Sequence, residues 1–170
     1  MKYLIFLGLM INALFAEGYS STPDVAPVKN DLYIKECGSC HFPYQPGLLP
    51  SNAWNKMMAN LDNHFNSDAT LDDKTFQTLS KYLNDNSAEK NMQYKRSNRI
   101  VSSLSPNQIP DSISTTPYMI KKHREIRKDL ITQKEVKGLF NCIACHTTAD
   151  KGIYSERDIK IPNFGRWEDD

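Results

Sequence analysis

Two copies of one pentapeptide carry most of the reactive side chains of this 170-residue chain. The first copy runs from Cys37 to His41 (CGSCH) and the second from Cys142 to His146 (CIACH). In a CxxCH motif, two thiols can form thioether bonds to the vinyl groups of a haem, and the histidine that follows can ligate its iron. The repeat therefore predicts two covalently bound haem c groups. The predicted tethering residues are Cys37, Cys40, Cys142 and Cys145.

Other chemistries of paired cysteines explain less of this pattern. A disulfide within each CxxC would close a very small loop, constrain the unfolded chain little and leave both histidines unexplained. A thioredoxin-like redox motif lies in a βαβ setting, and no strand patterns flank either copy. Zinc ribbons usually separate their CxxC pairs by about 15–20 residues, whereas 101 residues separate Cys40 from Cys142. Zinc therefore stays a weaker alternative.

The two remaining histidines are candidates for the second axial ligand of each iron. His64 lies 23 residues after His41, and His123 lies 23 residues before His146. Pairing by sequence distance gives His41 with His64 and His146 with His123, and a crossed pairing is an alternative. Methionine is the rival ligand type, because Met/His ligation is common in c-type cytochromes. The methionines available for it are Met57, Met58, Met92 and Met119.

Helical patterns surround these residues, and strand patterns are weak. A helix from Ser51, with apolar residues at helical spacing, is expected to deliver His64 at its C-terminal end. Further helices are expected over 31–37, from about Asp72, over 87–103 and from Pro117, the last carrying His123. A capping box at Thr132–Glu135 predicts a helix that leads to Cys142. Between these elements, residues 42–50 contain three prolines and read as a loop whose apolar side chains, Tyr44 among them, can line a haem.

The chain is expected to form two haem lobes around the cofactors, mainly α in class with long loops. Residues 105–116 are rich in turn formers and are the best linker, which gives a first lobe over 17–104 and a second over 105–170. Residues 17–30 read as a loose polar arm. The tail from Ile153 is expected to wrap across the second haem. Its basic residues Arg157, Lys160 and Arg166 are expected to be solvated rather than paired with haem propionates.

The N-terminus predicts export. Met1-Lys2 precedes an apolar run from Tyr3 to Ala16, which is typical of a signal peptide and short for a membrane anchor. Cleavage is expected at 16/17 or 18/19, and the mature chain is expected to lie in the periplasm without stable membrane insertion. Loss of Lys2 changes the formal net charge from +1 to 0. A neutral chain offers no basic field for nucleic acid.

Longer stretches of the sequence resemble the dihaem cytochrome c (DHC) family. The stretches are ECGSCHFPYQPGLLP, NHF, TPYMIKKHREI and NCIACHTTADKGIYSERDIKIP, while residues 87–116 match less well. The resemblance implies a helical periplasmic electron carrier with two bis-histidine haems, and it places His64 and His123 at the distal-ligand positions. It also implies redox partner proteins, either an oxygen-binding monohaem cytochrome or a membrane b-type cytochrome.

The motifs and the resemblance together predict an electron carrier rather than an enzyme, with filled coordination at both irons. The alternative is a dihaem peroxidase-like enzyme, which needs one iron with a displaceable ligand.

Overall fold

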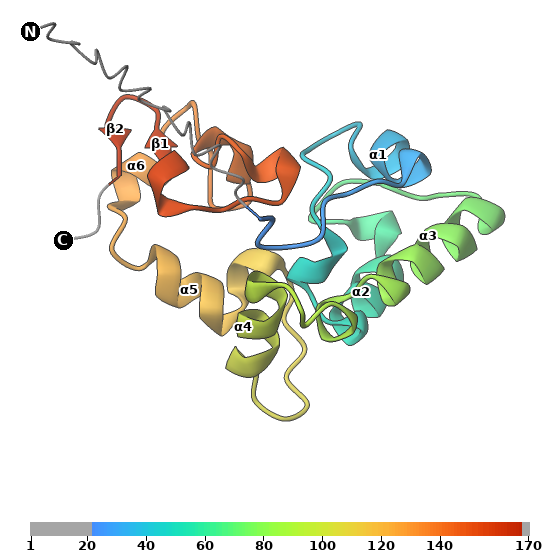
Figure 1. Ribbon diagram of the computed structural model, residues 1–170. Coiled ribbons are helices and arrows are strands. Elements are labelled where there is room, and N and C mark those ends of the chain that lie inside the picture. The colour runs from blue at the N-terminus through green and yellow to red at the C-terminus, as the bar shows by residue number, and fades with distance from the viewer. Residues whose placement is uncertain (1–21, 168–170) are drawn as a thin grey trace, which may run out of the picture.

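The computed structural model describes residues 22–167, and these residues form a mainly helical fold with two short strands (Figure 1). Seven 3₁₀ turns lie between the regular elements of this range. No helix of the described range is long and apolar enough to cross a bilayer. The predicted signal peptide, residues 1–16, lies outside the described residues. The regular elements are α1 (Asp31–Cys37), α2 (Ser51–Met58), α3 (Asp73–Asp85), α4 (Lys95–Ser103), α5 (Pro117–His123), α6 (Lys128–Thr132), β1 (Lys160–Ile161) and β2 (Gly165–Arg166).

Local caps define the helices that position the site. The side chain of Asn30 accepts a hydrogen bond from the backbone N–H of Tyr33 and so begins α1. Asp72 caps α3 in the same way through Thr75. Pro117 occupies the first turn of α5, where its missing N–H leaves no intrahelical bond unmade, and Thr116 caps that helix. The predicted starts of these three helices are therefore confirmed.

Two hydrophobic clusters support the cavity described below. One cluster packs α2 and α3 against α1, with Trp54, Leu79 and Leu83 at its centre. The other joins distant parts of the chain and contains Val25, Leu48, Ile100, Tyr118, Met119, Ala149 and Tyr154. Because the second cluster takes residues from both sides of residue 105, the two predicted lobes share a core. The boundary at 104/105 itself stays a prediction.

The N-terminal segment is not a loose arm where the structure describes it. Val25 is fully buried, and the backbone N–H groups of Asp24 and Val25 both donate to the carbonyl of Gly152. The backbone N–H of Arg96 donates in turn to the carbonyl of Asp24. This segment therefore joins α4 to the region after the second CxxCH motif. The composition of residues 17–30 suggested a loose arm. The three backbone hydrogen bonds that hold the segment join residues far apart in the chain, and such bonds leave no pattern in the local sequence.

Three predicted helices differ from those of the structure. The helix from Ser51 ends at Met58, and a 3₁₀ turn, Leu61–Asn63, precedes His64. The capping box at Thr132–Glu135 does not begin a helix, because Thr132 is the last residue of α6 and extended backbone at Gln133 follows. Residues 87–103 contain a 3₁₀ turn, Ala88–Lys90, before α4 rather than one continuous helix.

Candidate functional site

The first CxxCH motif turns off the end of α1. Cys37 is the last residue of the helix, and the backbone N–H of Gly38 bonds to the carbonyl of Ile34. A Cβ at Gly38 would lie 2.2 Å from that same carbonyl oxygen, so only glycine fits the turn. Cys40 and His41 follow the turn, with Cys40 exposed. Cys37, Cys40 and His41 all line the cavity described below.

His41 is oriented by its own neighbours. Its Nδ1 lies 2.8 Å from the carbonyl oxygen of Phe42, and because a carbonyl can only accept, Nδ1–H is the donor. The other ring nitrogen, Nε2, then carries the lone pair that can ligate a metal. The ring of Tyr44 lies 4.9 Å from the His41 ring, centroid to centroid, and limits its rotation.

His64 faces His41 from the segment after α2. The ring centroids are 6.1 Å apart, and the ring planes differ by 27°. The backbone reverses immediately after His64: Phe65 and Asn66 have positive φ values, 50° and 68°, and Ser67 N–H donates to the His64 carbonyl. A tight turn rather than a helix end thus delivers His64.

The second CxxCH motif is built on a 3₁₀ turn, Cys142–Ala144, and anchored by the C-terminal hairpin. The backbone N–H of Lys160 in β1 donates to the carbonyl of Cys145, and His146 pairs with Ile159 in an isolated bridge. The tail is therefore bonded to this motif through Ile159 and Lys160, and its expected position across the second haem stays a prediction. The ring of His146 lies against Tyr154, with centroids 5.2 Å apart.

His123, the last residue of α5, faces His146. The ring centroids are again 6.1 Å apart, but the planes differ by 81°. The Nδ1–H of His123 donates to the carbonyl of Met119, one turn earlier in the helix, at 2.8 Å. Its Nε2 is then the lone-pair nitrogen, as in His41. The Nδ1 of His146 is buried and has no hydrogen-bond partner among residues 22–167.

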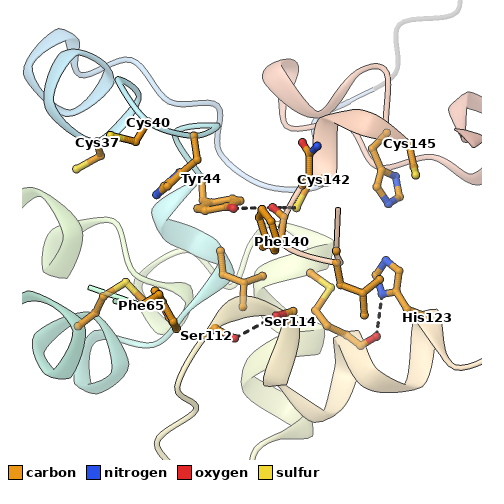
Figure 2. Close-up of a pocket in the computed structure, with 18 of the residues that line it drawn as sticks. Cys37, Cys40, Tyr44, Phe65, Ser112, Ser114, His123, Phe140, Cys142 and Cys145 are labelled. Carbon is orange, nitrogen blue, oxygen red and sulfur yellow. Dashed lines mark hydrogen bonds between the residues drawn. The ribbon is translucent and has the colours of Figure 1, made fainter. Parts of the chain in front are cut away.

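Both histidine pairs and all four cysteines line one continuous cavity of about 770 Å³. Figure 2 shows Cys37 and Cys40 on one side of this cavity and Cys142 and Cys145 on the other, with Tyr44 and Phe140 between them. Apolar side chains make up much of the remaining wall, among them Trp54, Met57, Met58, Leu61, Leu71, Ile131, Val136 and Ile161. Two flat, apolar ligands, each attached through one pair of cysteines, match such walls.

The spacing of the histidines fits a metal held between them. An imidazole nitrogen binds a first-row metal such as zinc at about 2.0–2.1 Å, and a ring centroid lies about 1 Å farther out, so two trans imidazoles have centroids about 6 Å apart. Both observed separations, 6.1 Å, agree with this arrangement. The four thiols are unpaired, so each is free for a thioether bond. The residues present therefore fit a haem iron with CxxCH attachment at each end of the cavity.

Burial favours the neutral, metal-binding form of three of these imidazoles. It lowers the pKa of His146 to about 4, with smaller contributions from His123 and Arg96, while Asp24 opposes the shift. Burial also lowers the pKa of His123 and His64. The Cys37 and Cys142 thiols stay protonated at neutral pH, because burial raises the pKa of each to about 11.

Three hydrogen bonds join the halves of the cavity. The Tyr44 hydroxyl donates to the carbonyl of Phe140 at 2.5 Å. The fully buried Gln45 donates from Nε2 to the carbonyl of Ala149 and accepts from the Tyr154 hydroxyl at 2.7 Å. The loop after the first motif is thus bonded to segments on both sides of the second motif.

Some of the residues that line the cavity were predicted from the sequence. Tyr44 lines the cavity as expected, whereas Leu48 and Leu49 are fully buried in the two core clusters. Met57, Met58 and Met119 line the cavity, and Met92 does not. The basic residues of the tail, Arg157, Lys160 and Arg166, are not part of the wall. Arg96 and Lys122 are, and nothing in the sequence distinguished them from other surface cations.

No curated protein sequence is significantly similar to the chain. Known structures are similar to it over most of its length. A dihaem c-type cytochrome from Shewanella baltica OS155 is 34% identical, with a TM-score of 0.67, over 82% of this chain and 98% of that one. A dihaem cytochrome c from Rhodobacter sphaeroides is 32% identical, with a TM-score of 0.68, over 76% of this chain and 100% of that one. DHC purified from Rhodobacter sphaeroides is 31% identical, with a TM-score of 0.61, over 75% and 99%.

Fold and site together define a small, mainly helical c-type cytochrome with two CxxCH motifs facing one cavity. The profile of the dihaem cytochrome c family (DHC) matches residues 33–154, and the chain belongs to that family. The cofactors are therefore two c-type haems, and the predicted mainly α fold is confirmed.

Proposed function

We propose that this protein is a periplasmic electron carrier whose two haems are each held between two histidines. The observation that carries the proposal is the pair of facing imidazoles at each end of the cavity, each pair adjacent to one CxxCH motif. His41 and His64 bind one iron, and His146 and His123 bind the other. Cys37 and Cys40 tether the first haem, and Cys142 and Cys145 tether the second.

When bound, each haem iron supplies a reversible Fe(III)/Fe(II) couple. The chain would supply two imidazoles to each iron, already facing one another before any redox partner arrives. The hydrogen bonds from Nδ1 of His41 and of His123 hold these rings with Nε2 toward the metal. Two strong ligands on each iron leave no coordination position for oxygen or peroxide. Such a site suits electron exchange and disfavours the peroxidase-like alternative.

Removal of the distal histidines tests this assignment. His64→Ala and His123→Ala should each convert one of the two ferric haems from low spin to high spin, and the variant haem should bind carbon monoxide once reduced. Met58→Leu and Met119→Leu are the controls, because both methionines line the cavity but are not ligands in this proposal. Absorption and EPR spectra of the purified holoproteins measure the outcome. A wild-type protein that already contains a high-spin haem, or that binds cyanide without delay, would instead support the peroxidase-like enzyme.

The proposed location and partners rest on the apolar N-terminus and on the family. A haem-containing protein released from the periplasm with its chain beginning near residue 17 or 19 supports export. The proposed partners are an oxygen-binding monohaem cytochrome and a membrane b-type cytochrome. Stopped-flow reduction of this protein by each purified candidate, at several protein concentrations, tests them: a second-order reaction supports a partner and no reaction excludes it.

A further inference from the structure

Arg96, in the first turn of α4, is a buried cation beside the second histidine pair. Its side chain is 11% exposed. Its guanidinium donates to the Tyr118 hydroxyl at 2.5 Å and to the carbonyl of Tyr154 at 2.9 Å. The same group lies 5.5 Å from the ring centroids of Tyr118 and Tyr154. Since Tyr154 packs on His146, this network fixes the guanidinium close to one end of the cavity.

The positive charge of Arg96 is only partly compensated. Asp24 is the nearest carboxylate, with its Oδ2 3.9 Å from the guanidinium, and that oxygen also accepts from the backbone N–H of Tyr154. The Nε of Arg96 is buried without a hydrogen-bond partner among residues 22–167, although the residue is part of the cavity wall. A buried donor without a partner is costly. Because this donor lies beside a cavity that binds an anionic cofactor, we expect Arg96 to interact electrostatically with that cofactor.

The charges around the first histidine pair have the opposite sign. Glu36 and Asp68 line that end of the cavity, and no basic side chain of the wall lies among the residues of the first motif and the His64 turn. Glu36 is bonded to Lys35, which is 77% exposed and is not part of the wall. At the second end, Lys122 lines the wall but is bonded to Glu156, which lines it too, so Arg96 is the cation of this end that has no ion pair with a carboxylate of the wall. The first end of the cavity therefore contains carboxylates as its charged wall residues, and the second end contains the cation Arg96; we call them the acidic end and the basic end.

The charge of Arg96 lies beside the place that the second haem would occupy, because Arg96 lines the cavity and bonds to Tyr154, whose ring packs on His146. A cation that disfavours a further positive charge at this place favours an added negative charge there, and water screens little at a buried site. One-electron reduction of a haem iron adds one negative charge.

We infer that Arg96 raises the reduction potential of the haem held by His123 and His146, so that an electron entering the protein resides first on this haem and the haem at His41 and His64 is reduced second. In each step one electron from an external one-electron donor converts one Fe(III) to Fe(II), and no bond is made or broken. The inference rests on the proposed electron-carrier function and adds the order of reduction. It also assigns the direction of electron flow inside the protein, from the acidic end of the cavity to the basic end.

Stepwise reduction of the holoprotein tests this order. Haem methyl NMR signals are assigned to the second haem by contacts to Tyr154 and to the first by contacts to Phe65, and each is followed as dithionite is added.

Arg96→Gln should lower the affinity of the second haem for an electron about tenfold, which is ~59 mV for a one-electron couple, and leave the first haem nearly unchanged. Arg96→Lys keeps the charge and should retain most of the wild-type difference. Arg99→Gln removes an exposed cation from the same helix and should change neither haem.

A second substitution keeps the test decisive if Arg96→Gln does not fold. Asp24→Asn removes the opposing carboxylate charge and should raise the potential of the second haem. Reduction of the first haem before the second in the wild type overturns the inference, as does an unchanged second haem in both Arg96→Gln and Asp24→Asn. Failure of the electron-carrier proposal looks different, because it shows in the wild-type spin state and ligand binding before any variant is made.

Discussion

The hydroxyl of Tyr44 donates a hydrogen bond to the backbone carbonyl of Phe140, 96 residues later in the chain. Tyr44 lies three residues after His41, and its ring packs on that histidine. Phe140 lies two residues before Cys142. One side chain therefore joins the two haem-attachment segments across the middle of the shared cavity (Figure 2).

We expect Tyr44→Phe to reduce the free energy of unfolding of the holoprotein by about 1 kcal/mol, the net value of one hydrogen bond. For a chain of this size the melting temperature should fall by about 2–4 °C. Thermal denaturation followed by circular dichroism measures the change. Tyr94→Phe is the control, because Tyr94 is not part of the cavity wall, and a loss as large in the control would contradict a specific bridging role.

The two histidine pairs should give two different EPR signals. The ring planes differ by 27° in the pair His41 and His64 and by 81° in the pair His123 and His146. Two nearly parallel imidazoles interact mainly with the same iron d orbital and so separate its energy from that of the second d orbital. Two nearly perpendicular imidazoles interact with one d orbital each, and the two energies stay close. The ferric protein should therefore show one moderately anisotropic low-spin signal and one highly anisotropic signal at low temperature. Two identical signals would contradict the ring orientations.

Acid should release the histidines of the first haem before those of the second. A protonated imidazole cannot bind iron, so an imidazole with a lower pKa resists release to a lower pH. Burial lowers the pKa of His146 to about 4, whereas His64 is less buried and its pKa is lowered less. As the pH falls from 7, the low-spin EPR signal of the haem at His41 and His64 should disappear first, and it should return when neutral pH is restored. Simultaneous loss of both signals at one pH would contradict the difference in burial.

Removal of the haems should abolish the native packing. An empty cavity of 770 Å³ at about 24 cal/mol per Å³ would cost about 18 kcal/mol, which exceeds the roughly 5–15 kcal/mol that stabilises a typical domain. Entry of water reduces this cost but leaves apolar walls wet. A variant with all four cysteines changed to alanine should therefore lack a cooperative thermal transition and near-ultraviolet circular dichroism. A haem-free chain that melts as sharply and as high as the holoprotein would show that the haems are not needed for the core.

Short-range features of the site could be predicted from the sequence. The CxxCH spacing indicated haem attachment because the chemistry itself requires two thiols and an imidazole within five residues. The start of α5 at Pro117 and its delivery of His123 followed from local capping and the fixed φ of proline. By contrast, the helix expected to deliver His64 ends at Met58, and a turn with two positive φ values places this histidine instead. Helical spacing of apolar residues continues past Met58 to Leu61, which still packs against the cluster of α2 and α3 although the helix has ended.

The sequence by itself determined the cofactor and the residues from which its proposed attachment points and ligands come, four cysteines and four histidines, because these depend on residue type and local spacing. Only the tertiary structure decided which histidines face one another, that both pairs share one cavity, and that Arg96 is buried beside His146 and not beside His41. These features depend on contacts between residues far apart in the chain, such as Tyr44 with Phe140 and Arg96 with Tyr154. Such contacts arise when separate apolar surfaces pack together, and no local pattern records where they meet.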